Sequence, residues 1–187
     1  MIEVYAYWNQ LPDGTCTRNG TVIVSGGSNS VIGNVILKNP GSSRPINKTP
    51  NAIFANRLQF RPDATMYAIA DLFELDKRPG IVQLFNLFDF VHTDPEMATT
   101  IVLLTQDDIL QNISENKLPT YLGWGNEWTW PVTKDICQDI FNEILPRSPY
   151  LLPEMENNPF THPLYLMRYG KNRSLCRQIL LSFRSLL

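Results

Sequence analysis

The first 38 residues show the alternating pattern of half-buried β-strands. Residues 4–8 and 21–24 are rich in β-branched and aromatic side chains, and the turn sequence Pro12-Asp13-Gly14 lies between them. This pattern predicts a β-hairpin within residues 1–29. Gly26-Gly27 then precedes the apolar residues 31–37, which we expect to form the first core strand. Residues 40–62 are rich in Gly, Ser, Pro, Asn and Arg and show little apolar periodicity, and loops of that length are usually functional or disordered.

Apolar positions change to helical spacing after residue 62 and then alternate with strand-like runs. Asp63 is a candidate N-cap for a helix that carries Met66, Ile69 and Phe73 on one face. Residues 81–88 form a nearly continuous apolar run, which is typical of a strand buried on both faces of a parallel sheet. We expect further helices from 94, from 105, over 136–144 and over 175–183, and further core strands at 121–124 and 164–168. This order predicts an α/β protein with a mainly parallel, four-stranded sheet.

Length and composition favour one domain. A chain of 187 residues with 43% hydrophobic content can bury one sizeable core, so we expect a single domain over residues 1–187. None of its apolar runs approaches the roughly 20 residues that cross a bilayer. The N-terminus lacks the pattern of a secretory signal, which leaves the cytoplasm as the expected compartment. The three cysteines are odd in number and far apart, which favours inert thiols over a disulfide framework or a metal site.

Charge is unevenly distributed along the chain. The formal net charge is −2, which by itself argues against a generic nucleic-acid binder. However, residues 38–61 carry five basic and no acidic side chains, and so do the residues after 156, whereas residues 62–156 are strongly acidic. If the fold brings the two basic segments together, a polyanion would meet a positive face. The alternative is the ordinary solvated charge of a protein surface.

Polar residues at the ends of the expected strands are the candidates for chemistry, because ligands of open α/β sheets bind outside the carboxyl ends of the strands. Asn39-Pro40-Gly41 follows the first core strand, although such a tripeptide is also a common turn. Asn86 lies inside an apolar strand, where its amide either forms hydrogen bonds to neighbouring backbone groups or binds a ligand. His162 precedes a proline near the C-terminus and could equally be a satisfied loop residue.

Together, these residues form an ordered set that resembles the uracil-DNA glycosylase superfamily, whose Asn-Pro-Gly version is most like the mismatch-specific thymine/uracil branch. The order is also similar, and more closely, to an uncharacterised bacterial and phage family with a Leu-Asn-Pro-Ser-Thr motif. The resemblance covers roughly residues 30–187 and leaves the N-terminal hairpin outside. The matching residues are Lys38-Asn39-Pro40-Gly41-Ser42, Pro62-Asp63-Ala64-Thr65, Asn86-Leu87-Phe88, Trp124-Gly125 and His162-Pro163-Leu164-Tyr165.

The resemblance implies a three-layer α/β/α fold around a four-stranded parallel sheet and a monofunctional DNA N-glycosylase. Such an enzyme flips a uracil or modified pyrimidine out of single- or double-stranded DNA and excises it, leaving an abasic site. It implies that Asn39 positions the attacking water and that neutral His162 stabilises the departing base. Base-binding residues would be Asn86, Gly41 and Phe54, with Phe60 as the alternative to Phe54. Contacts to DNA would come from Ser42, Ser43, Arg44, Leu164, Tyr165, Lys171 and Arg173.

Departures from the superfamily pattern widen the range of substrates. No aromatic residue follows Pro40 to exclude thymine, so larger or modified pyrimidines such as those of phage DNA would fit, and defence against phage is a hypothesis. The inserting wedge is either Leu164 or Tyr165, because the usual His-Pro-Ser-Pro-Leu motif is absent. We expect no cofactor, no metal and a monomer. The alternatives are a non-catalytic nucleic-acid-binding module and an enzyme acting on free nucleotides or nucleosides, whereas zinc-deaminase and Ser-His hydrolase motifs are missing.

Overall fold

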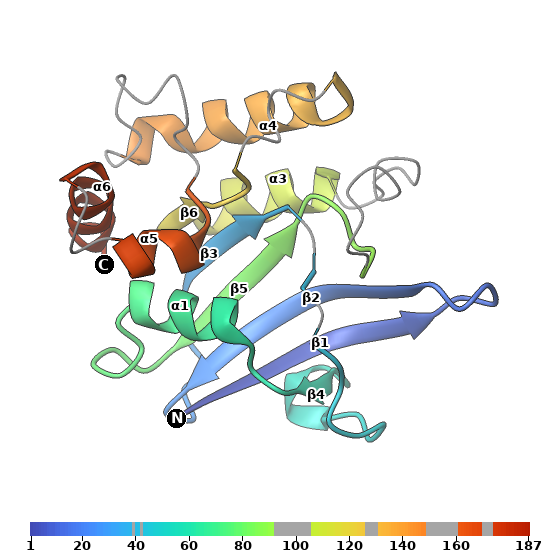
Figure 1. Ribbon diagram of the computed structural model, residues 1–187. Helices are drawn as coiled ribbons and strands as arrows, with labels where there is room; N and C mark the ends of the chain where they lie inside the picture. Colours follow the sequence, from blue (N-terminus) through green and yellow to red (C-terminus); the bar gives the residue numbers. More distant parts are fainter. Residues whose placement is uncertain (39, 42, 92–105, 126–130, 149–160, 170–173) are drawn as a thin grey trace.

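One open, mixed β-sheet of six strands forms the centre of the protein (Figure 1). The computed structural model describes residues 1–187 except 39, 42, 92–105, 126–130, 149–160 and 170–173. The strands follow the order β4-β1-β2-β5-β3-β6. Their bounds are Ile2–Gln10 (β1), Cys16–Ser25 (β2), Val31–Leu37 (β3), Leu58–Phe60 (β4), Ile81–Asn86 (β5) and Thr120–Leu122 (β6). Strand β3 pairs parallel with both β5 and β6, and the remaining pairs are antiparallel.

Helices lie on both faces of this sheet, so the expectation of an α/β protein is confirmed. The described residues contain α1 (Ala64–Leu72), α3 (Gln106–Asn116), α4 (Pro131–Ile144), α5 (Pro163–Tyr169) and α6 (Ser174–Arg184). Figure 1 shows α1 and α5 on one side of the sheet and α3 on the other. Phe183 joins α6 to the α1 side, because its ring meets the rings of Phe73 and Tyr121 edge-on at 5.1 and 5.2 Å. None of the described helices has the length and hydropathy to cross a membrane.

Local sequence accounts for the position of α1. Asp63 is its N-cap, as predicted, and its Oδ1 accepts a hydrogen bond from the Met66 backbone N–H at 2.9 Å. The helix buries Met66 and Ile69 against the sheet. Its C-cap Phe73 lies so close to β3 that a Cβ added to Gly33 would be 2.2 Å from the Phe73 ring. Glycine at position 33 therefore permits the close approach of helix and sheet that brings α1 to the end of β3.

The N-terminal hairpin is part of the main sheet and not an extension of it, which corrects the four-stranded prediction. Strand β2 pairs antiparallel with β5, from Thr21 opposite Leu84 to Val24 opposite Ile81. Strand β1 pairs with β2 and, on its other edge, with β4. The pairing follows from the pattern of the hairpin, whose inward side chains Val4, Ala6 and Ile23 are fully buried in the main core; an isolated hairpin would leave these side chains in water.

Residues 164–168 form part of helix α5 instead of the expected fourth parallel strand. The apolar run is short, and a short run does not distinguish a strand from a helix. Pro163 occupies the first position of the helix, where a proline is favoured because its missing N–H needs no partner there. The loop prediction for 40–62 was also incomplete, because this segment contains β4 and the short 3-10 helix η1 (Ala52–Phe54). The helix expected from residue 94 begins outside the described residues.

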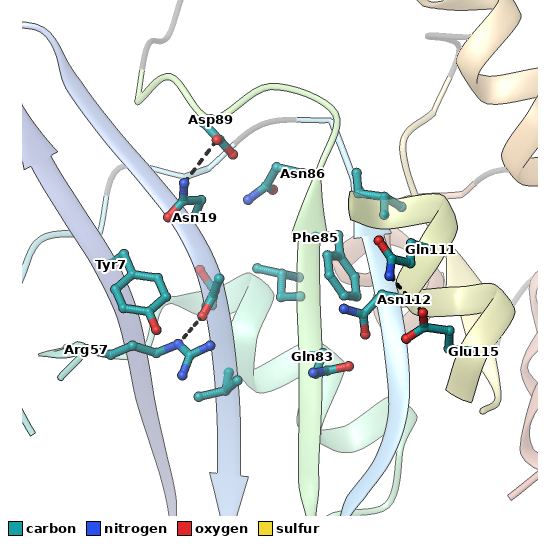
Figure 2. Close-up of a pocket in the computed structure, with 15 residues that line it drawn as sticks. Tyr7, Asn19, Arg57, Gln83, Phe85, Asn86, Asp89, Gln111, Asn112 and Glu115 are labelled. Carbon is teal, nitrogen blue, oxygen red and sulfur yellow. Dashed lines mark hydrogen bonds between the residues drawn. The ribbon is translucent and has the colours of Figure 1, made fainter. Parts of the chain in front are cut away.

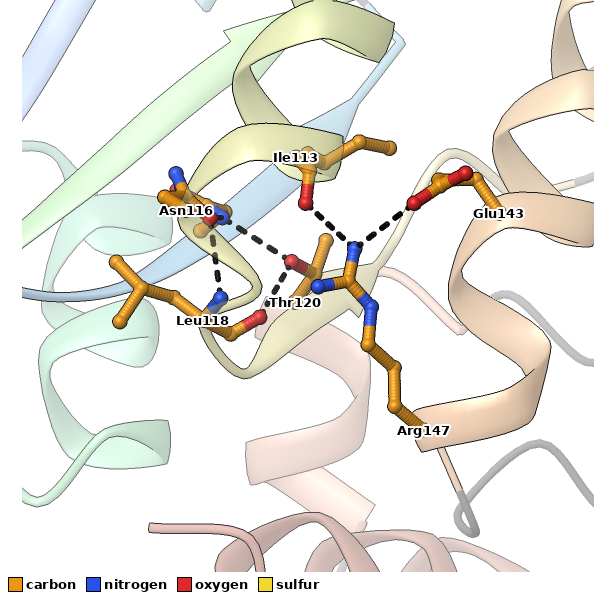
Figure 3. Close-up of polar contacts among 7 residues, drawn as sticks. Ile113, Asn116, Leu118, Thr120, Glu143 and Arg147 are labelled. Carbon is orange, nitrogen blue, oxygen red and sulfur yellow. Dashed lines mark hydrogen bonds and ion pairs between the residues drawn. The ribbon is translucent and has the colours of Figure 1, made fainter.

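Polar contacts join α3, β6 and the end of α4 on the side opposite α1 (Figure 3). The Arg147 guanidinium donates to the Ile113 carbonyl at 2.6 Å and forms an ion pair with Glu143 at 3.7 Å. Asn116 accepts from the Leu118 backbone N–H at 3.0 Å, and the Thr120 hydroxyl donates to the Leu118 carbonyl. These contacts fix the start of β6 and, through it, the sheet edge beside β3.

Candidate functional site

A cavity of about 120 Å³ opens at the carboxyl ends of β3 and β5. Leu37 and Asn86, the last residues of these two strands, are paired in register and both line the cavity. Open α/β sheets bind their ligands at this position. The described residues that line it are Arg18, Leu37, Gly41, Asp63, Thr65, Met66, Leu84, Asn86 and His162. The structure therefore brings together Gly41, Asn86 and His162, three of the site residues predicted from the sequence.

Asn86 is a buried amide that makes no side-chain hydrogen bond to the described residues. It is 4% exposed, and neither its Oδ1 nor its Nδ2 has a hydrogen-bond partner in the part of the chain that the structure describes. Because side chains alternate along a strand, Asn86 shares with Val82 and Leu84 the sheet face that packs against α1. A buried polar group without a partner costs about 1–3 kcal/mol. The sequence left two roles for Asn86, binding a ligand or forming hydrogen bonds to the backbone. The structure therefore favours the ligand-binding role.

His162 lines the cavity as a neutral imidazole. Burial lowers its pKa below the ordinary value, and the negative charge of Asp63 opposes this shift in part. Its Nδ1 accepts a hydrogen bond from the Leu164 backbone N–H at 3.3 Å. An imidazole that accepts at Nδ1 carries its proton on Nε2 when neutral, so His162 can donate a hydrogen bond to a ligand at neutral pH.

The position of His162 is set by the end of β6. The Tyr121 hydroxyl donates to the Thr161 carbonyl at 2.6 Å and holds the segment that leads into α5. Pro163 packs directly on Gly123, where an added Cβ would be 2.7 Å from its Cδ. The absence of a side chain at Gly123 thus lets the residues around His162 approach the carboxyl end of the parallel strands.

Arg18 lines the same cavity and was missed by the sequence analysis. It comes from β2 and is 2% exposed, with its guanidinium 5.5 Å from the Phe60 ring centroid. One terminal nitrogen lies 3.5 Å from the Ser43 carbonyl, while Nε has no partner among the described residues. Burial lowers the pKa of Arg18 to about 10, opposed by the nearby charge of Asp63, so the side chain remains protonated at neutral pH. The resemblance does not extend to the hairpin, and the one sequence signal is that Arg18 is the single basic residue before Lys38.

Asp63 places a carboxylate in the wall of the cavity in addition to capping α1. Its Oδ1 accepts from the Met66 N–H, and its Oδ2 would lie 3.1 Å from a Cβ added to Gly41. Glycine at position 41 therefore leaves room for this second oxygen beside the cavity. From the sequence alone Asp63 was identified as the N-cap and as part of the matching motif Pro62-Asp63-Ala64-Thr65, without a role in the site, because a capping Asp and a site Asp have the same local pattern.

Phe54 is not among the described residues that line this cavity, so the cavity gives no support to its predicted role in base stacking. Its ring stacks on Tyr5, with centroids 4.2 Å apart and planes at 23°. Tyr5 packs with Val22 and Val24 in a small cluster separate from the main core, so Phe54 lies on the sheet face opposite the cavity. Phe54 packs there against the apolar side chains of Tyr5, Val22 and Val24. The alternative candidate, Phe60, is 1% exposed and lies beneath the Arg18 guanidinium.

The structure describes some of the residues that were predicted to contact DNA. Leu164 and Tyr165 are 36% and 55% exposed, and the Tyr165 ring is 6.2 Å from that of His162, so both lie at the surface next to the cavity. The Arg44 guanidinium is 5.2 Å from the Trp8 ring centroid, and the Ser43 hydroxyl donates to the Arg61 carbonyl at 2.6 Å. The remaining predicted residues lie outside the described part of the chain: Asn39, Ser42, Lys171 and Arg173.

A larger cavity of about 460 Å³ lies between β2, β5 and α3 (Figure 2). Some of its polar groups bind one another: Arg57 donates to the Gly20 carbonyl at 2.6 Å and lies over the Tyr7 ring, and Gln111 donates to Glu115 at 2.8 Å. Others, Thr21 Oγ1 and Gln83 Oε1, have no hydrogen-bond partner among the described residues. Asn86 lines both cavities and, of the residues predicted from the sequence, is the one that reaches the larger. The smaller cavity brings Asn86 together with Gly41, His162 and the buried charge of Arg18 at the carboxyl ends of the parallel strands, so we take it as the candidate site.

Comparison of the chain with models of protein families, with curated proteins and with solved structures found no match.

Proposed function

We propose that the protein is a DNA glycosylase that excises uracil or a modified pyrimidine. The observation that carries the proposal is the meeting of Gly41, Asn86 and His162 in one cavity. These residues are far apart in the chain. The resemblance to the uracil-DNA glycosylase superfamily assigns Gly41 and Asn86 to base binding and His162 to catalysis at the same site. Their juxtaposition at the ends of parallel strands supports a glycosylase-like arrangement within the six-stranded sheet.

The size of the cavity supports a single base as the ligand. An apolar protein cavity of about 150 Å³ holds one benzene molecule, so a cavity of about 120 Å³ is of the order needed for one six-membered ring. The sugar and phosphates of a nucleotide would then remain outside. This is the arrangement of enzymes that extrude a base from the DNA stack into a pocket.

The groups in the cavity match the requirements of glycosidic bond cleavage. The bond between C1′ and the base nitrogen breaks with its electron pair moving to the base, and a water oxygen forms the new bond to C1′. The Nε2–H of His162 is available to donate to a base carbonyl as its negative charge grows. Asn86 can both donate to and accept from the edge of the base.

A proton acceptor for the attacking water is also present. The resemblance assigns the orientation of this water to Asn39, whose amide is a poor base. Asp63 supplies the one carboxylate among the described lining residues, and it can accept the proton that the water loses. Leu164 and Tyr165, exposed next to His162, are placed to fill the space left by the extruded base, and Ser43 and Arg44 are candidates for phosphate contacts.

The proposal is tested by incubating the protein with labelled oligonucleotides, single- and double-stranded, that contain uracil, thymine mismatches or 5-hydroxymethyluracil, followed by alkali. We expect strand breaks at one or more of these bases, lost in Asn86→Ala and His162→Ala. Asn112→Ala removes an amide of the larger cavity and is the matched control, which should keep full activity.

Two other outcomes would overturn the proposal in favour of the alternatives. Tight DNA binding without breaks at any base would support a non-catalytic binding module. Release of base from free nucleosides but not from DNA, with no steep dependence of binding on salt, would support an enzyme of free nucleosides.

A further inference from the structure

Arg18 carries a buried positive charge that the described residues match only in part. A buried ion is strongly unfavourable unless it is paired and hydrogen-bonded. In the described residues the guanidinium has one hydrogen bond, at 3.5 Å to the Ser43 carbonyl, and an aromatic ring beneath it. No carboxylate of the described residues lies within ion-pair distance, and Nε has no partner. A ligand in the adjoining cavity is the natural partner for such a group.

Arg18 and His162 reach the cavity from opposite sides of the parallel strands. In the sheet order β2-β5-β3-β6, Arg18 comes from β2, next to β5, while His162 is held at the end of β6, next to β3. A base whose edge meets Asn86 at the end of β5 would therefore face hydrogen-bond donors from both directions. His162 supplies a neutral donor, whereas Arg18 supplies a full positive charge in a site of low dielectric, where its attraction for an anion is strong.

We propose that Arg18 is a catalytic residue that stabilises the departing base as an anion. This inference rests on the proposed function. As the C1′–N bond breaks, both of its electrons pass to the base, and the negative charge spreads from the ring nitrogen to the carbonyl oxygens. The water oxygen bonds to C1′, its proton passes to Asp63, and the released base takes a proton from solvent. The Arg18 guanidinium keeps its own protons throughout and acts through its charge and hydrogen bonds.

The proposal makes the hairpin an essential part of the active site. Arg18 lies on β2, which the resemblance leaves out, so this chain would use a leaving-group contact that its motif residues do not supply. Phe60 and the Ser43 carbonyl are then positioning groups, since they hold the guanidinium against the cavity.

The dependence of the rate on the leaving group tests this role. A fluorine at C5 withdraws electrons and makes the departing anion more stable, so excision of 5-fluorouracil needs less help from Arg18 than excision of uracil. Removal of one preorganised donor to a developing anion lowers rates by about 100-fold or more. We therefore expect Arg18→Gln to slow single-turnover excision of uracil about 100-fold and that of 5-fluorouracil by about tenfold or less. Arg18→Lys, which keeps the charge, should recover part of the loss.

Controls separate this role from a structural one. Arg57→Gln removes a guanidinium of the larger cavity and should leave the ratio of the two rates unchanged. Thermal unfolding of each variant shows whether it is folded. Equal slowing of both substrates by Arg18→Gln in a folded protein would overturn the role of Arg18 while leaving the glycosylase function standing. Failure of the wild type to release either base would instead overturn the proposed function and this inference with it.

Discussion

Replacement of Asn86 by leucine should raise the stability of the protein while abolishing its activity. The buried amide makes no hydrogen bonds to the described residues through either polar atom, and leucine has a similar size without the unmet polar groups. Relief of a buried, unsatisfied polar group contributes about 1–3 kcal/mol. For a chain of 150–250 residues, each kcal/mol shifts the melting temperature by about 2–4 °C. We therefore expect Asn86→Leu to melt about 2–12 °C higher than the wild type.

Asn34 is the matched control for this prediction, because it is a fully buried asparagine in the neighbouring strand with its hydrogen bonds made. Its amide donates to Asn116 Oδ1 and to Thr120 Oγ1, both at 3.1 Å. Asn34→Leu leaves these partners unsatisfied and should lower the stability by about 1–3 kcal/mol. Calorimetry or circular dichroism measures both variants. Destabilisation of Asn86→Leu similar to that of Asn34→Leu would refute the view that Asn86 is kept for a ligand.

Three further predictions follow from single contacts. Burial lowers the pKa of His162 in the folded state, so as the pH falls the unfolded state binds a proton on this imidazole before the folded state does. The free energy of unfolding should therefore fall as the pH drops below about 6.5. Urea titrations should show a smaller fall for His162→Gln. Gly123→Ala forces a Cβ against Pro163 and should lower the stability by about 1–3 kcal/mol and slow base excision, whereas normal excision would show that this packing does not position His162. Phe54→Ala removes the stack on Tyr5 and should lower the stability by at least about 0.5–1.5 kcal/mol without changing excision, as measured by thermal unfolding and single-turnover assays.

The fold could be predicted wherever a pattern is local. The cap at Asp63 and the helical spacing after it predicted α1, and the continuous apolar run predicted the buried strand β5. The run at 164–168 was too short to separate helix from strand, and the prediction there was wrong. The place of the hairpin in the sheet depends on pairing between β2 and β5, about 60 residues apart in the chain, which no local periodicity contains.

The residues of the candidate site also fall into those that the sequence could predict and those that it could not. Gly41 follows an expected strand, Asn86 lies inside one and His162 precedes one. The order of the motifs assigned them to one site, and all three line the cavity. Arg18 could not be found by that route, because it faces the cavity only through the antiparallel addition of β2 to β5. Phe54 was assigned to the site from its place in a long loop, and the structure binds it to the opposite face through Tyr5.

Release of free base is the most direct test of the glycosylase proposal. DNA of both strand forms, carrying uracil or a modified pyrimidine, is incubated with the protein, and free bases and abasic sites are quantified together. The account predicts equal amounts of one free base and of abasic sites from the wild type, with neither product from Asn86→Ala or His162→Ala. The contradicting result would be a protein that is folded and binds DNA but releases no base from any of these substrates. In that case the cavity of Arg18, Asn86 and His162 does not serve base excision.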